Sequence, residues 1–185
     1  MLQGAHRWLD SAEKLLKEFI EGYPDDFRRA DGFDALGQVF ERRGDVAKAL
    51  EQYELAMARV REHSGMRPDA WLNYAQLIAR KRLRAHYGQA KAAVEEFDSP
   101  NPFPLHIFQV NRALALIAMD ERRNEDAVRF ATKALAAADA RATGLRYHPF
   151  LGLVGAREEG AIRELRRIAG PGRRSIGWRI WRARD

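Results

Sequence analysis

The residues that could transfer protons or bind a metal are five scattered histidines, at positions 6, 63, 86, 106 and 148. A zinc site on one helix needs two histidines about one turn apart, and no two of these have that spacing. His148, between Tyr147 and Pro149, is the best-placed candidate for a general acid or base, but no acidic residue accompanies it in the sequence. We therefore interpret His148 as a structural residue that holds its loop.

The other groups that could do chemistry are few. Serine and threonine total six, and none lies in a nucleophile elbow. The glycine-containing stretches at 152–155 and 170–174 lack the Lys-Ser/Thr ending of a phosphate-binding loop. The acid pairs Asp25–Asp26 and Glu95–Glu96 are typical of solvated helix ends. The sequence therefore predicts neither an enzyme nor a bound cofactor or metal.

Basic side chains give the second kind of chemistry, which is the recognition of anions. The net charge is +6, and residues 160–185 carry eight arginines against two acids, so the rest of the chain is neutral. Arginines stand beside tryptophans in the tail, and such a composition suits an anionic membrane surface, single-stranded nucleic acid or an acidic protein groove. Alternatively, the tryptophans fold back over leftover apolar surface. The candidate tail contacts are Arg173, Arg174, Trp178, Arg179, Trp181 and Arg182.

A second basic cluster, "RKRLR", lies at residues 80–84. It indicates either a contact to nucleic acid or an acidic peptide, or simply the C-terminal end of a helix, where cations are favoured.

The elements that position these groups are predicted to be helices, because one small-and-bulky face recurs along the chain. Each copy places residues four and three positions apart, as on one side of a helix. The leading alanines of the four copies are 37, 41 and 37 residues apart. The copies are Ala12-Leu16-Phe19, Ala49-Tyr53-Ala56, Ala90-Val94-Phe97 and Ala127-Ala131-Ala134.

A second helix precedes three of these faces, beginning near Phe33, Trp71 and Asn111. Each carries a glycine or alanine within its apolar face, and small residues of this kind let two antiparallel helices approach closely. Gly44 lies at the turn of the first pair and suits the left-handed conformation that ends a helix.

Residues 30–63 resemble the tetratricopeptide repeat (TPR) on these positions: Phe33, Leu36, Gly37, Phe40, Gly44, Ala49, Tyr53 and Ala56. Residues 68–101 depart through a turn about three residues longer, and residues 108–139 are degenerate. Residues 5–24 look like the second helix of a repeat, which either caps the array or shows that the chain is the C-terminal part of something larger. The resemblance implies an all-α superhelix (solenoid) of antiparallel helix pairs over residues 1–139.

A packing loop and capping helix are expected over residues 140–169, followed by the basic tail at 170–185. The apolar residues Tyr147, Phe150, Leu151, Leu153 and Val154 should pack against the last helix pair, because they are too apolar to remain in solvent. Residues 158–170 form a short helix that begins with acids and ends with arginines.

In TPR arrays the first helix of each pair lines the concave side. Carried over, this predicts a partner-binding face of Asp31, Asp34, Gln38, Glu41, Arg42, Asp69, Asn73, Gln76, Arg80, Gln109, Arg112, Leu116 and Asp120. Some TPR proteins bind the C-terminal carboxylate of chaperones, but of those binding positions only Asn73 matches. An acid, Asp34, stands where a lysine is wanted, so we expect this chain not to bind that carboxylate.

The resemblance favours a non-catalytic scaffold or adaptor that binds a protein or peptide partner. The general look of the sequence suggests that it is the sensing or adaptor part of a bacterial assembly. The alternative is a nucleic-acid-binding protein that uses the arginine tail and the 80–84 cluster. The longest apolar run, at 113–119, is too short to span a bilayer. There is no cysteine, which excludes disulfides and permits the cytoplasmic location that we expect.

Overall fold

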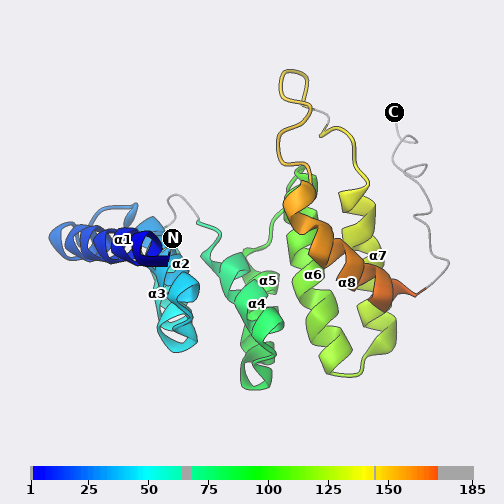
Figure 1. Cartoon of the computed structure of the whole chain (residues 1–185), viewed down its shortest axis with the longest axis horizontal. Helices are drawn as coiled ribbons and strands as arrows, with labels where there is room; N and C mark the ends of the chain where they lie inside the picture. Colours follow the sequence, from blue (N-terminus) through cyan, green and yellow to red (C-terminus); the bar gives the residue numbers. More distant parts are fainter. Residues whose placement is uncertain (1, 64–67, 144, 171–185) are drawn as a thin grey trace. The chain divides into compact units, whose positions relative to one another are not determined.

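The computed structural model describes residues 2–63, 68–143 and 145–170. Within these ranges the chain forms eight α-helices and two short 3-10 helices, and no β-strand, so the all-α class is confirmed. None of the helices in the described ranges is long and apolar enough to cross a membrane. The chain divides into two compact units, Met1–Leu77 and Ile78–Asp185, with the boundary inside α4 (Ala70–Lys81), and each unit is described by itself (Figure 1).

The first unit contains α1 (Leu2–Gly22), α2 (Arg29–Arg43), α3 (Val46–Glu62) and the beginning of α4. Helix α2 packs against both α1 and α3. Gly37 of α2 lies against the ring of Tyr53 on α3, so closely that an added Cβ would be 2.6 Å from Tyr53 Cε1. Gly32 likewise faces Phe19 of α1, and an added Cβ there would be 3.0 Å from Phe19 Cδ1. The small residues therefore mark the places where helices approach closely.

The turn between α2 and α3 ends one helix and starts the next. Gly44 has a φ of 82°, in the left-handed region predicted for it, and its N–H donates to the carbonyl of Glu41 at 3.0 Å. The N–H of Asp45 then donates to the carbonyl of Phe40, and the Asp45 carboxylate accepts from the amide of Lys48. These bonds satisfy backbone groups that a helix leaves unpaired at its ends.

Two other helices end in the same way without glycine. Arg82, after α4, and Arg122, after α6 (Pro104–Asp120), have φ values of 54° and 61°. The N–H of Arg123 donates to the carbonyl of Ala118 at 2.9 Å, which repeats the bond that Asp45 makes after α2. The sequence did not reveal these two caps, because arginine carries no preference for the left-handed region.

The second unit contains the end of α4, then η1 (Arg84–His86), α5 (Tyr87–Phe97), α6, α7 (Asn124–Ala138), η2 (Ala156–Glu158) and α8 (Glu159–Ala169). Helices α6 and α7 pack together, and α8 lies across both of them (Figure 1). Their buried core is mostly alanine, which allows this close packing. It consists of Phe108, Ala115, Ala131, Ala134, Ala137, Ala161, Leu165 and Ala169.

The prediction that the apolar residues after α7 pack against the last helix pair is wrong for three of the five. Tyr147, Phe150 and Leu151 are 79%, 75% and 56% exposed, whereas Leu153 is partly buried and Val154 packs against the alanine-rich core. The reason is that α8 already covers α6 and α7. The segment is therefore held by its own backbone hydrogen bonds and projects beyond the ends of these helices (Figure 1).

Candidate functional site

Three of the predicted partner-binding residues meet at the carboxylate of Asp34 in the first unit. Asp34 lies on α2 and is only 8% exposed. Its Oδ1 accepts a hydrogen bond from Nδ2 of Asn73, on α4, at 2.9 Å, and its Oδ2 accepts one from Nε2 of Gln38 at 3.1 Å. The structure thus joins the first helices of two successive predicted pairs through a buried carboxylate. We call the surface formed by Asp31, Asp34, Gln38, Asp69 and Asn73 the acidic face.

The pKa values of two carboxyl groups of the acidic face are raised, so their ionised forms are disfavoured. Burial raises the pKa of Asp34, and the nearby carboxylates of Asp69 and Asp31 raise it further, while the two amide hydrogen bonds oppose this rise. Burial also raises the pKa of Asp31, against the attraction of Arg28. Removing carboxylates from water disfavours their ionised form, and like charges add to that effect. A cation placed here would therefore be stabilised by more than one carboxylate.

Asp69 of the acidic face is positioned by the start of α4. It directly precedes α4, and its carbonyl accepts from the amides of Leu72 and Asn73 at 2.9 Å each, so its position is fixed by the first turn of that helix. Its side chain is exposed, and Asp31 is partly exposed. These two acids are the accessible groups of the face, whereas Asp34 is occupied by the amides.

The other predicted residues of the first unit do not join this cluster of hydrogen bonds. Arg42 is exposed and its guanidinium lies 5.3 Å from the ring centroid of Trp8, a cation–π distance. Gln76 is partly buried on α4.

In the second unit the predicted residues have separate environments. Arg80 is exposed near the end of α4, and Gln109 is partly buried on α6. Arg112, also on α6, is partly buried. Its guanidinium lies 3.8 Å from Glu158 of η2 and 3.5 Å from Glu164 of α8. Arg112 therefore contacts its own chain, and its charge is already partly neutralised by α8 and η2.

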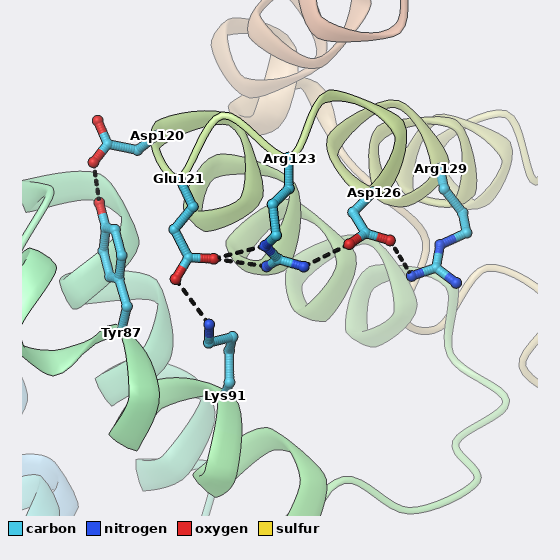
Figure 2. Close-up of polar contacts among 7 residues, drawn as sticks. All are labelled: Tyr87, Lys91, Asp120, Glu121, Arg123, Asp126 and Arg129. Atoms are coloured by element: carbon cyan, nitrogen blue, oxygen red, sulfur yellow. Dashed lines mark hydrogen bonds and ion pairs between the residues drawn. The ribbon is translucent and has the colours of Figure 1, made fainter.

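A network of ion pairs that the sequence did not reveal joins α5 to the α6–α7 turn (Figure 2). Lys91 Nζ lies 2.8 Å from Glu121 Oε1, and Arg123 donates to both Glu121 and Asp126. Arg129 donates to the other oxygen of Asp126 at 2.6 Å. Burial favours protonation of Glu121, yet Lys91 and Arg123 outweigh it and hold the pKa of Glu121 below its ordinary value.

Asp120 makes the second connection to α5. Its carboxylate accepts from the hydroxyl of Tyr87 at 3.1 Å and from Nε of Arg84 at 2.6 Å (Figure 2 shows the tyrosine). Arg84 lowers the pKa of Asp120, and burial together with that carboxylate raises the pKa of Tyr87 to about 12. Arg84 is the last residue of the basic cluster at 80–84, so one of its cations is used within the protein.

Two of the histidines, His148 and His106, lie in the connections between helices or at a helix start. His148 is exposed, and the bonds at this residue are made by its backbone, whose N–H donates to Leu145 and whose carbonyl accepts from Oγ1 of Thr143. His106 Nε2 lies 2.8 Å from Oδ1 of Asp98, and both residues line an open groove formed by the α5–α6 connection and the first half of α6. This pair ties the start of α6 to the end of α5.

No protein-family model, curated protein or solved structure matches the chain. The six candidate contacts of the basic tail lie outside the described residues. The residues that the structure places together as a surface are therefore those of the acidic face, and its central bond, Asp34 to Asn73, could not be found from the sequence, where the two residues are far apart.

Proposed function

We propose that the chain is a non-catalytic scaffold, built as a TPR-like array of helix pairs, that holds a polypeptide partner on the acidic face. The observation that carries this proposal is the Asp34 carboxylate, which links Gln38 on α2 to Asn73 on α4. Side chains from two successive helix pairs then form one polar surface. In TPR-like arrays that is the surface on which partners bind.

The chemistry of the face favours a basic partner segment. Asp31 and Asp34 both have raised pKa values, so each gains when a cation comes close and stabilises its ionised form. A lysine or arginine of the partner would reach Asp31 and Asp69 first, because these acids are more exposed than Asp34. Complementary charge of this kind sets specificity and the rate of association.

The same bonds argue against a partner with a free C-terminal carboxylate. The side-chain amide of Asn73, the one residue that matches the carboxylate-binding pattern, already donates to Asp34. A second carboxylate would have to displace Asp34 and would be repelled by it. A chaperone-type acidic C-terminal peptide should therefore not bind.

The test is a selection from a random peptide library followed by measurement of the affinity of the best peptide by calorimetry. We expect enrichment of lysine- and arginine-containing peptides, and a loss of about fivefold in affinity for each of Asp31→Asn and Asp69→Asn, since a rim charge contributes up to about 1 kcal/mol. Asp25→Asn is the matched control, because Asp25 is an exposed acid in the α1–α2 connection.

Two results would contradict the proposal. One is the absence of enrichment for basic peptides. The other is a selected peptide whose affinity is the same for the wild type and both variants of the acidic face. Tight binding of nucleic acid that is lost between low and physiological salt would instead favour the nucleic-acid alternative.

A further inference from the structure

We propose a second interaction surface, separate from the acidic face: the loop of residues 145–152, which we call the projecting loop, binds the surface of an anionic lipid bilayer. It lies in the connection between α7 and α8 and projects beyond the ends of α6, α7 and α8 (Figure 1). Three observations carry the proposal: the loop is held in shape, it exposes apolar side chains, and the stretch of residues 140–157 around it carries arginines and no acid.

The shape of the loop is set by backbone hydrogen bonds at both ends. The N–H of Thr143 donates to the carbonyl of Pro149 at 2.8 Å, and the N–H of Leu151 donates to that of His148 at 3.1 Å. At the far end the carbonyl of Gly152 accepts from the N–H of Leu105 at 2.7 Å. Gly152 has a φ of 71° and lies so close to Phe103 that an added Cβ would be 2.6 Å from its ring. The exposed side chains are thus presented by a fixed backbone.

Three large apolar side chains within five residues point into solvent. Tyr147 and Phe150 are at least three-quarters exposed, and Leu151 is more than half exposed. Isolated exposed apolar residues are ordinary, but a cluster of them on an ordered loop marks an interaction site. An aromatic pair beside a leucine is the composition that enters the boundary between lipid headgroups and acyl chains.

The charges within residues 140–157 all have one sign, and the nearest acids in the sequence are Asp139 and Glu158 at the borders of this stretch. Residues 140–157 contain three arginines and no aspartate or glutamate. Arg141, Arg146 and Arg157 are exposed, and none of them forms an ion pair within the described part of the chain. By contrast, Arg84 and Arg123 of the same unit are paired with acids. Unpaired cations beside an apolar tip are complementary to anionic headgroups.

A bilayer fits this surface better than single-stranded nucleic acid does. Bases stack on the flat faces of aromatic side chains, and an exposed leucine offers no such face. The guanidinium of Arg146 also lies 5.4 Å from the ring centroid of Tyr147, which occupies one face of that ring. Insertion into lipid uses the whole apolar surface of Phe150 and Leu151, and the arginines can contact lipid phosphates at the same time.

The chain contains no cysteine, so one introduced thiol gives a reporter at a single position. Phe150→Cys in the full chain, labelled with an environment-sensitive fluorophore, is mixed with vesicles of phosphatidylcholine with or without phosphatidylserine. We expect a blue shift and quenching by spin-labelled lipid only with phosphatidylserine. Leu15→Cys is the control, because Leu15 is 64% exposed on α1 and should remain in water.

Affinity for the anionic vesicles is then measured by sedimentation. Arg146→Gln and Arg141→Gln should each weaken binding about fivefold, and Leu151→Ser should weaken it at least as much. The labelled loop should still respond when residues 173–185 are deleted, since the proposal assigns the contact to the loop.

Four outcomes would overturn the proposal. They are no binding to anionic vesicles, binding in which the Phe150→Cys label does not respond, a response that is lost when the tail is deleted, and a response to a single-stranded oligonucleotide at lower concentration than to the vesicles. The third would assign the membrane contact to the tail, and the fourth would assign the loop to nucleic acid.

Discussion

Replacing Gly37 by alanine tests whether small residues are needed where α2 meets α3. The added Cβ would lie 2.6 Å from Cε1 and 2.7 Å from Cδ1 of Tyr53, whereas carbon atoms in ordinary contact are about 3.5–4.0 Å apart. The ring must therefore move by about 1 Å. It cannot turn out to solvent, because Tyr53 is fully buried and its hydroxyl donates to Glu41 at 3.0 Å.

The expected effect combines two opposing contributions. Overpacking a buried contact costs about 1–3 kcal/mol, while alanine favours a helix interior over glycine by about 1 kcal/mol. Gly37→Ala should therefore lower the free energy of unfolding by about 1 kcal/mol. Gly88→Ala is the matched control, because a Cβ at Gly88 on α5 meets nothing within 4 Å, and this variant should gain about 0.5–1 kcal/mol.

Urea unfolding of both variants, followed by far-ultraviolet circular dichroism, gives the two free energies. Ala49→Leu provides a second perturbation of the same helix pair, since Ala49 is fully buried, and should cost about 1–3 kcal/mol. The reasoning is refuted if Gly37→Ala is as stable as Gly88→Ala, because Tyr53 would then yield without cost and the glycine would not be needed for close approach.

Three further predictions concern helix ends and titrating groups. Arg82→Gly and Arg122→Gly should each raise the free energy of unfolding by about 0.5–1 kcal/mol in urea, because both positions have positive φ and glycine removes the steric strain; no gain at either position would contradict the left-handed caps. Burial raises the pKa of Asp34, so the folded chain binds that proton more tightly than the unfolded chain does, and stability is lost as the pH rises through the raised pKa. Asp34→Asn removes this dependence, so its stability relative to wild type should increase as the pH rises above about 4, and a difference that is constant with pH would be inconsistent with a raised pKa. Tyr87→Phe should remove a tyrosine ionisation near pH 12 from the alkaline absorbance titration and lower the free energy of unfolding by about 1 kcal/mol. A titration curve that is unchanged near pH 12 would show that the pKa of Tyr87 is not about 12.

Local patterns in the sequence were sufficient to predict the helices and their close contacts. Helical spacing of apolar residues predicted α2, α3 and the later helices, and glycine at position 44 predicted a left-handed cap because glycine has no steric penalty there. The caps at Arg82 and Arg122 could not be predicted in this way, since the surrounding hydrogen bonds impose a conformation that arginine does not favour.

The candidate site was predicted only in part, because its key contacts join residues distant in the sequence. Asp34 and Asn73 were placed on the same surface by the resemblance to TPR proteins, but the bond between them depends on how two helices pack. The exposure of Tyr147 and Phe150 was missed for a related reason. An apolar residue is buried only where a surface remains to cover it, and α8 had already covered α6 and α7.

The side-chain amides of Gln38 and Asn73 offer the most direct test of the proposed binding face. Both donate to Asp34, so a basic segment that approaches this carboxylate must change their environment. In a nuclear magnetic resonance titration with the selected peptide, we expect saturable shifts of these two amides and an unchanged amide of Asn111, which donates to the carbonyl of Ile107 on α6. A peptide that binds while the side-chain amide resonances of Gln38 and Asn73 do not shift would contradict the account.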